Sequence, residues 1–456
     1  MNAPASSGTL RKKIFTSAKL SAVQFGSNIG LRLISTVVLT RLLAPEVYGV
    51  FAVVLLYRQL LEMLSDIGIR DVILTKEGDL DAPFLSTCWT VSILRGALIF
   101  LVSGLIALVI FWLQRQGVFS AESSYVDPVL PLAIFVLGGA GFITGVASIN
   151  RYVYEKNMLF GRVTLGTFLA NVVSLIVTIA LAYAFHSIWA LVAGAYAHAF
   201  FLTVFSFLAF PGAKLRLALE RSSLGVIIDR GKWIMGSSTL TVLSESADRF
   251  IFGFVMSSSM FGFYFIARQI FDLGVSFLTS VNAQMGMQVF TELLKKPAVE
   301  FRARYYKYRI FFDTLAGLGA GGLFVVMPLA VDLIFDDRYA GVASIAQILI
   351  IGWIFLGPAV LRHAFMAERK FRELTLLGLM GTFVTWFGLI LAVLLDSITT
   401  ALVVFALKSA PEVIVMSWLG FRKGWVQPSR EAIVVLLFGV GGALGWIALQ
   451  IWAAIF

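Results

Sequence analysis

Arginine and acidic side chains recur at helical spacing inside long apolar stretches of this 456-residue sequence. Arg58, Glu62 and Asp66 follow one another at intervals of four residues, and Arg268 and Asp272 repeat that interval. Residues four apart lie on the same face of a helix. An arginine near the middle of a membrane span costs about 2.5–3.5 kcal/mol to insert, and its planar guanidinium binds phosphate through paired hydrogen bonds. This pattern predicts a polar pathway whose arginines could bind an anion.

Further polar residues form matching stripes 213 positions apart in the sequence. The first stripe contains Gln24, Asn28 and Arg32. Its counterpart contains Ser237, Thr241 and Glu245, and Asp248 extends it. Because Arg32 has no acidic neighbour on its own predicted helix, we expect it to have a functional role.

The paired arginines allow two interpretations. Arg58 with Glu62 and Arg268 with Asp272 are either ligands for a substrate or ion pairs that only stabilise their helices. The acidic residues also allow two roles: they could bind a coupling proton or sodium ion, or balance the arginine charge. The candidates for cation coupling are Glu245, Asp248 and Asp272.

The composition predicts an all-α polytopic membrane protein. Hydrophobic residues make up 59% of the chain and charged residues 14%. An apolar helix of about 20 residues crosses the ~30 Å hydrocarbon layer, and the long continuous runs do not fit alternating barrel strands. The predicted spans lie near residues 17–43, 47–74, 85–113, 128–149, 160–184, 187–210, 224–247, 260–289, 307–335, 341–365, 373–395, 398–420 and 431–455.

The basic residues predict the orientation of the chain. The net charge is +10, and most of the 36 lysines and arginines lie in segments that are cytoplasmic if the N-terminus is cytoplasmic. The predicted outer loops contain only Arg115, Arg249 and Arg338. This asymmetry is the positive-inside rule. The basic surplus is therefore topogenic and does not indicate a nucleic-acid partner.

Short motifs repeat along the chain at nearly the same offset. Gly49 matches Gly262, Glu155-Lys156 matches Glu368-Arg369, and Arg95 matches Arg309. An even number of spans per repeat preserves orientation, so we expect two six-helix lobes related by a pseudo-twofold axis along the membrane normal, with a cleft between them. The predicted divisions are a polar N-terminus (1–16), an N-terminal lobe (17–210), a cytoplasmic linker (211–232) that overlaps the start of span 7, a C-terminal lobe (224–420) and one extra C-terminal span (431–455). Glycine pairs such as Gly141/Gly145 and Gly317/Gly321 predict close helix packing.

The sequence offers little for enzymatic chemistry. The one cysteine, Cys88, permits neither an intrachain disulfide nor a thiolate metal site. No Walker loop, dinucleotide-binding glycine motif or HExxH motif is present, and the outer loops are too short for a typical membrane glycosyltransferase or polymerase. We expect a carrier that is not an enzyme and uses no cofactor or metal.

Two segments resemble a known family. The run RLLAPEVYG from Arg41 to Gly49 is similar to the signature of polysaccharide-repeat-unit flippases, within the multidrug/oligosaccharidyl-lipid/polysaccharide exporter superfamily. The segments Asp248–Gly253 and Gly262–Ala267 are also typical of that family. Ala44 departs from the signature, which usually has glycine there.

The resemblance implies a V-shaped bundle of two six-helix lobes in a bacterial inner membrane. The implied cargo is an undecaprenyl-diphosphate-linked oligosaccharide, the repeat unit of an exopolysaccharide or lipopolysaccharide O-antigen, moved by alternating access. Related lipid II flippases bind the diphosphate through arginines on helices 1, 2 and 8, where Arg32, Arg58 and Arg268 fall here. Membrane lipid, a polysaccharide polymerase and chain-length machinery are the implied partners. Because relatives commonly have 12 or 14 spans, the thirteenth is a departure.

Other functions stay open at this point. The main alternative is a cation-coupled multidrug antiporter of the same superfamily, which would favour a cavity rich in acids and poor in arginine. A membrane polymerase or ligase and a non-transporting scaffold for polysaccharide synthesis are further alternatives. In the flippase interpretation, the polar cavity residues are Gln24, Asn28, Ser237, Thr241 and Glu245.

Overall fold

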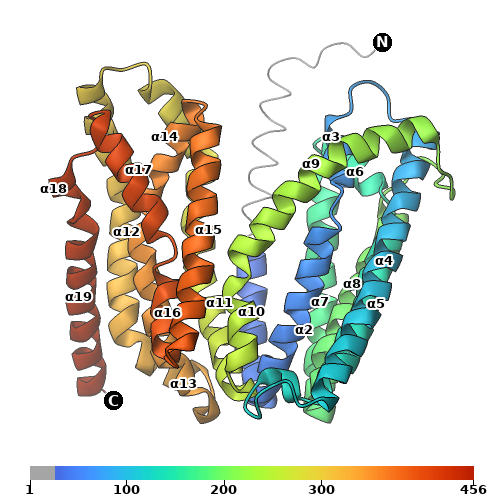
Figure 1. Cartoon of the computed structure of the whole chain (residues 1–456), viewed down its shortest axis with the longest axis horizontal. Coiled ribbons are helices and arrows are strands. Elements are labelled where there is room, and N and C mark those ends of the chain that lie inside the picture. Colours follow the sequence, from blue (N-terminus) through green and yellow to red (C-terminus); the bar gives the residue numbers. More distant parts are fainter. Residues whose placement is uncertain (1–25, 456) are drawn as a thin grey trace. The chain divides into compact units, whose positions relative to one another are not determined.

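The computed structural model describes residues 26–455, except for the side chains of Trp233, Ser237 and Gln284. All regular secondary structure in this part of the chain is helical (Figure 1). This confirms the predicted all-α polytopic class. Helices close every backbone hydrogen bond within one segment, as a chain that crosses lipid requires.

The chain folds into two compact units, Met1–Phe261 and Gly262–Phe456. The first unit begins with a helix over 26–42 and ends near the start of α11 (Ser258–Leu293). Between them lie α2 (Pro45–Leu64), α3 (Ile69–Thr75), α4 (Ala82–Arg115), η1 (Ser124–Val126), α5 (Leu130–Val146), α6 (Asn150–Lys156), α7 (Phe160–Phe185), α8 (Ile188–Ala209), α9 (Arg221–Glu245) and α10 (Ala247–Val255). The C-terminal lobe was predicted to begin at residue 224, whereas α9 and α10 belong to the first unit.

Proline and glycine explain several boundaries in the first unit. Pro45 occupies the first turn of α2, where its missing N–H has no intrahelical partner to lose. Gly68 has a positive φ of 62° and separates α2 from α3. Gly49 allows close backbone contact, because a Cβ at this position would lie 1.8 Å from the carbonyl oxygen of Ser258. This packing gives a physical reason for the glycine in the Arg41–Gly49 run.

Inside the first unit, α4 packs along α5, α7 along α8, and α5 also contacts α8 and α2. Glycines permit the first of these contacts: a Cβ on Gly96 would lie 3.1 Å from the Cα of Phe142. The first unit also has a small core in which Phe84, Leu85 and Cys88 of α4 pack with Ile69 and Ile73 of α3. These contacts hold α2, α4, α5 and α6 together around the pocket described below.

The second unit contains α12 (Ala298–Ile334), η2 (Asp337–Tyr339), α13 (Gly341–Ile350), η3 (Ile351–Phe355), η4 (Pro358–Leu361), α14 (Arg362–Ala367), α15 (Phe371–Leu394), α16 (Ile398–Ala406), α17 (Ala410–Arg422), α18 (Pro428–Glu431) and α19 (Ile433–Ile455). Pro358 and Pro411 stand in the first turns of η4 and α17. Figure 1 shows α12 and α19 side by side, and the two helices pack along much of their length. The extra C-terminal span is thus part of the second unit.

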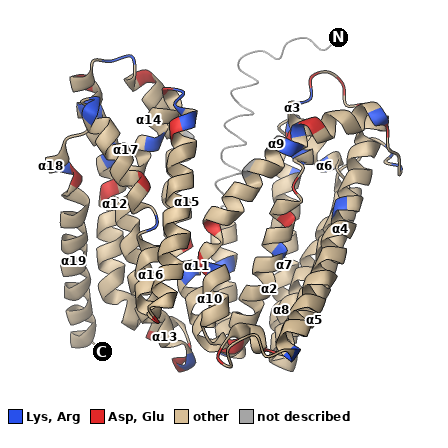
Figure 2. Ribbon diagram, viewed as in Figure 1, with Lys and Arg blue, Asp and Glu red and all other residues tan. Residues whose placement is uncertain are grey.

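Ten helices among the described residues are long and apolar enough to cross a membrane, or up to eleven if the bent pair α5–α6 is one span. These helices account for the predicted spans except two. Span 1 lies partly outside the described residues. Span 7 is covered by α9, which is helical but is not among these ten apolar helices. Charged residues are sparse along the helices (Figure 2), and α5, α8 and α19 contain none.

Candidate functional site

Arg58 lies in the last third of α2 and pairs with the acidic residue one turn later. Its Nε donates to Oε1 of Glu62 at 2.8 Å. The ion pair foreseen from the four-residue spacing therefore forms. The side chains are still accessible, at 22% for Arg58 and 38% for Glu62, so pairing does not bury either charge.

Arg58 and Glu62 also line a polar pocket of about 260 Å³ inside the first unit. Two more arginines, Arg95 of α4 and Arg151 of α6, line the same pocket. All three arginines are half-buried. Among the described residues, the pocket therefore brings together three cationic side chains and a single carboxylate from sequence positions almost a hundred residues apart.

Arg95 is fixed by the end of α2. Its Nη2 donates to the carbonyl oxygen of Glu62, and its Nε donates to the hydroxyl of Ser65 at 3.1 Å. A cation at the C-terminal end of a helix satisfies carbonyl groups that have no intrahelical partner. Sequence reasoning identified Arg95 only as a repeat marker, since its contact with α2 depends on the packing of two helices.

Arg151 approaches the pocket from α6. Its Nη2 donates to the hydroxyl oxygen of Tyr152 at 2.5 Å, and its guanidinium lies 4.6 Å from the centre of the Tyr152 ring. The 62° bend between α5 and α6 directs this short helix across the end of α5. Arg151 was not predicted as a site residue, because only that bend brings it to the pocket.

The stripe on the first helix is described in part. Gln24 lies outside the described residues. Asn28 is half-buried and accepts a hydrogen bond from the side-chain amide of Asn171 on α7, at 3.0 Å. Arg32 is exposed, and its carbonyl oxygen accepts a bond from the hydroxyl of Thr36. Asn28 and Arg32 therefore differ in environment although they share a helical face.

The matching stripe on α9 is also uneven. Thr241 and Glu245 are exposed, whereas the side chain of Ser237 is not described. α9 ends at Glu245, and Asp248 follows in α10, where it is fully buried. The helix break places the carboxylates of Glu245 and Asp248 in different environments. No group of three or more His, Cys, Asp or Glu suited to a metal ion occurs among the described residues.

Arg268 of α11 is held more tightly than Arg58. Its Nε lies 3.0 Å from Oδ1 of Asp272, and its side chain is only 6% exposed. The guanidinium also lies 4.4 Å from the centre of the Phe405 ring. In this conformation the Arg268 cation is enclosed by its carboxylate partner and aromatic side chains, as the ion-pair interpretation expects.

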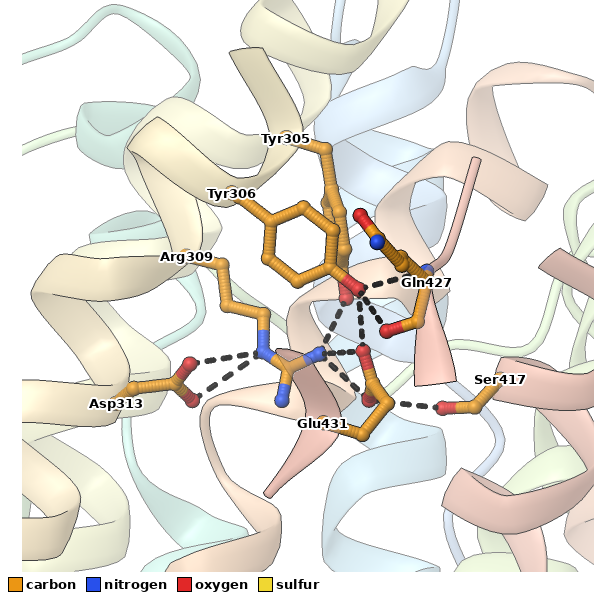
Figure 3. A network of polar contacts seen from close by, with 7 residues as sticks. All are labelled: Tyr305, Tyr306, Arg309, Asp313, Ser417, Gln427 and Glu431. Atoms are coloured by element: carbon orange, nitrogen blue, oxygen red, sulfur yellow. Dashed lines mark hydrogen bonds and ion pairs between the residues drawn. The ribbon is translucent and has the colours of Figure 1, made fainter. Parts of the chain in front are cut away.

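A second buried arginine, Arg309 of α12, forms a network that the sequence did not predict (Figure 3). Its Nε donates to Oδ2 of Asp313 at 3.0 Å, and its Nη1 donates to both carboxylate oxygens of Glu431 at 2.6 Å. Tyr306 donates a further hydrogen bond to Glu431, at 2.7 Å. The i,i+4 spacing of Arg309 and Asp313 was a usable signal, but Glu431 lies 122 positions from Arg309.

Residues 38–344 match the model of a family described as "Polysaccharide biosynthesis protein". The chain belongs to that family. None of the curated protein sequences is similar enough to match the chain.

Several solved structures share the fold. A structure of the lipid II flippase MurJ in an inward closed conformation matches with a TM-score of 0.70 at 12% identity, covering 96% of this chain and 98% of that chain. An inward-facing multidrug resistance MATE family transporter matches with a TM-score of 0.60 at 14% identity, covering 89% and 94%. A eukaryotic MATE transporter, AtDTX14, matches with a TM-score of 0.58 at 10% identity, covering 94% and 99%. The chain thus has the fold of these transporters.

Proposed function

We propose that this protein is a flippase that moves an undecaprenyl-diphosphate-linked oligosaccharide across the bacterial inner membrane by alternating access. The repeat unit would serve the synthesis of an exopolysaccharide or a lipopolysaccharide O-antigen. Membership of the polysaccharide biosynthesis family is the observation that carries this proposal. The fold shared with a lipid II flippase supports it, because that protein is also a flippase of a lipid.

The charges of the first unit are consistent with an anionic headgroup. We propose that Arg32 and Arg58, with Arg268 after its ion pair opens, contact the diphosphate, since guanidinium forms paired hydrogen bonds with phosphate oxygens. Asn28, Thr241 and Glu245 would contact the sugars, and Gln24 and Ser237 remain candidates from the sequence. Polymerase and chain-length proteins are the proposed partners.

A cation-coupled multidrug antiporter is the second candidate, and the fold shared with the MATE transporters favours it. Such a protein would use its acidic residues for coupling, with Glu245, Asp248 and Asp272 as the candidates. The excess of arginine over carboxylate around Arg58 favours the flippase, because a cationic drug would be repelled there.

The test is deletion of the gene, followed by measurement of lipid-linked oligosaccharides in the inner membrane. The flippase proposal expects an undecaprenyl-diphosphate-linked oligosaccharide to accumulate with its sugars facing the cytoplasm, and mass spectrometry of that lipid would identify the cargo. The wild-type gene should reverse the accumulation. Unchanged lipid-linked intermediates together with new drug sensitivity would contradict the proposal and support the antiporter.

A further inference from the structure

The pocket lined by Arg58, Arg95 and Arg151 has an excess of positive charge within the protein. Among the described residues that line it, Glu62 is the one acidic residue, and that carboxylate already pairs with Arg58. Within the described part of the chain, Arg95 bonds a carbonyl and a hydroxyl, and Arg151 bonds a tyrosine hydroxyl. Within the described residues, two half-buried guanidinium groups are thus held by neutral acceptors alone. Half-buried charge without a counter-ion is costly, and a bound anion would reduce that cost.

The repeat offers an internal comparison for Arg95. Its counterpart, Arg309, binds two carboxylates, one from Asp313 on the next turn and one from Glu431. The position one turn after Arg95 is Ile99, an apolar residue that lines the pocket. In the second unit, carboxylates of the protein itself therefore bind Arg309. In the first unit, the corresponding Arg95 lines a pocket.

The rest of the lining suits a small oxygen-rich anion. Ser92, Thr144 and Tyr152 contribute hydroxyl groups, and Gly96 and Gly145 let α4 and α5 approach closely beside them. The volume of about 260 Å³ exceeds the ~30 Å³ share of a single water molecule. A phosphate or carboxylate group with its attached atoms therefore fits these dimensions and could accept bonds from several donors.

We infer that this pocket is an oxyanion-binding site that takes one anionic group of the transported substrate, either a phosphate of the lipid headgroup or the carboxylate of an acidic sugar. The inference rests on the proposed function for the identity of the substrate. It adds Arg95 and Arg151 to the binding residues, and it places their ligand within the first unit.

Binding of small probes to the purified full-length protein in lipid nanodiscs tests the site. Pyrophosphate represents the headgroup, glucuronate represents an acidic sugar, and glucose is the neutral control, each titrated calorimetrically at low ionic strength. One anion should bind and glucose should not. Arg151→Gln should weaken that binding at least about tenfold, because each lost charged hydrogen bond is worth about 1.5–3 kcal/mol. Arg115→Gln, an exposed substitution at the end of α4, should leave it unchanged.

Arg95→Gln should weaken binding by a similar factor, and Arg95→Lys, which retains the charge, should weaken it less. If removing the bonds to α2 unfolds the Arg95 variants, Arg151→Gln and Arg58→Gln still test the pocket. Preference for pyrophosphate would assign the group to the headgroup, and preference for glucuronate would assign it to the sugar. Failure of both anions to bind wild-type protein, or equal binding by the arginine variants, would overturn the inference. Neither result would alter the lipid accumulation expected on gene deletion, so the two proposals fail separately.

Discussion

Arg58 and Arg309 show two ways in which this chain stabilises an arginine within a membrane-spanning helix. Arg309 is fully buried and bound by Asp313 and Glu431. Arg58 has one carboxylate partner and stays accessible at 22%. The first arrangement suits a structural role because it leaves little room for a ligand. The second leaves a guanidinium edge accessible for substrate.

We predict that Arg309→Met will destabilise the second unit by about 3–5 kcal/mol, because the buried Asp313 and the half-buried Glu431 would keep their charges without a cation. The expected result is a lower melting temperature in detergent and reduced abundance in the membrane. Fluorescence-detected gel filtration after heating measures the change.

A matched variant separates charge from volume in this network. Replacing all three residues (Arg309→Met with Asp313→Leu and Glu431→Leu) removes the unpaired carboxylates and should recover much of the lost stability. A triple variant that is less stable than Arg309→Met would show that the network does not stabilise the unit through charge pairing.

A second prediction concerns the exposed Arg32. Arg32→Ala should abolish polymer export while membrane abundance remains normal, because the exposed side chain contributes little to packing. Surface polymer is measured by sugar composition and abundance by immunoblot. Arg115→Ala is the control and should export normally. Wild-type export by the Arg32 variant would remove this residue from the proposed diphosphate site.

The sequence predicted the local parts of the site and missed those that depend on packing. Arg58 with Glu62 and Arg268 with Asp272 were foreseen as possible ion pairs because four-residue spacing alone brings such side chains together. Glu431 could not be assigned to Arg309 without knowing that α18 packs near α12. The spacing also did not show whether a predicted ion pair remains accessible to a ligand. Arg268, for example, is enclosed beside the ring of Phe405.

At the scale of elements, a glycine seam between α12 and α19 explains how the thirteenth predicted span joins the second unit. A Cβ on Gly321 would lie 2.0 Å from the carbonyl oxygen of Phe438, and one on Gly441 would lie 2.5 Å from that of Leu318. Small residues on both helices let their backbones approach, which is the usual route to helix association in lipid. The Gly317/Gly321 pair was predicted to allow such packing, but its partner was unknown.

This seam predicts different effects for two neighbouring glycines. Gly321→Ala should destabilise the protein by about 1–3 kcal/mol, because the methyl group collides with the backbone of α19. Gly319→Ala, where the Cβ lies 3.8 Å from the Trp353 ring, should be neutral or stabilise by up to about 1 kcal/mol. Thermal unfolding in the same detergent compares them. Equal melting temperatures for the two variants would contradict the seam.

Long apolar runs were the most predictable elements. Spans such as 160–184 and 373–395 coincide closely with α7 and α15. The bend between α5 and α6 and the break between α9 and α10 were not foreseen, because both fall at the ends of predicted spans (128–149 and 224–247), where the sequence predicted loops. A long apolar run in the sequence shows the length and composition of a helix, whereas a bend in that helix depends on its neighbours.

At the scale of the whole molecule, the distribution of basic residues predicts the topology. In a Cys88→Ala background, Gln116→Cys should react with a membrane-impermeant maleimide added to cells that have a permeabilised outer membrane and an intact inner membrane. Lys214→Cys should react only after the inner membrane is permeabilised, because its basic loop is predicted to be cytoplasmic. Gln116 and Lys214 are both exposed, so both positions are open to the reagent. The reverse pattern of labelling would invert the proposed orientation.

Reconstitution into liposomes tests whether the protein transports a lipid-linked oligosaccharide. Proteoliposomes would contain a fluorescent undecaprenyl-diphosphate-linked oligosaccharide, with an added glycosidase reporting the fraction exposed outside. Wild-type protein should make the inner-leaflet fraction accessible faster than protein-free liposomes, and Arg58→Gln should slow it towards the protein-free rate. A wild-type rate equal to that of protein-free liposomes would show that the protein does not transport this lipid.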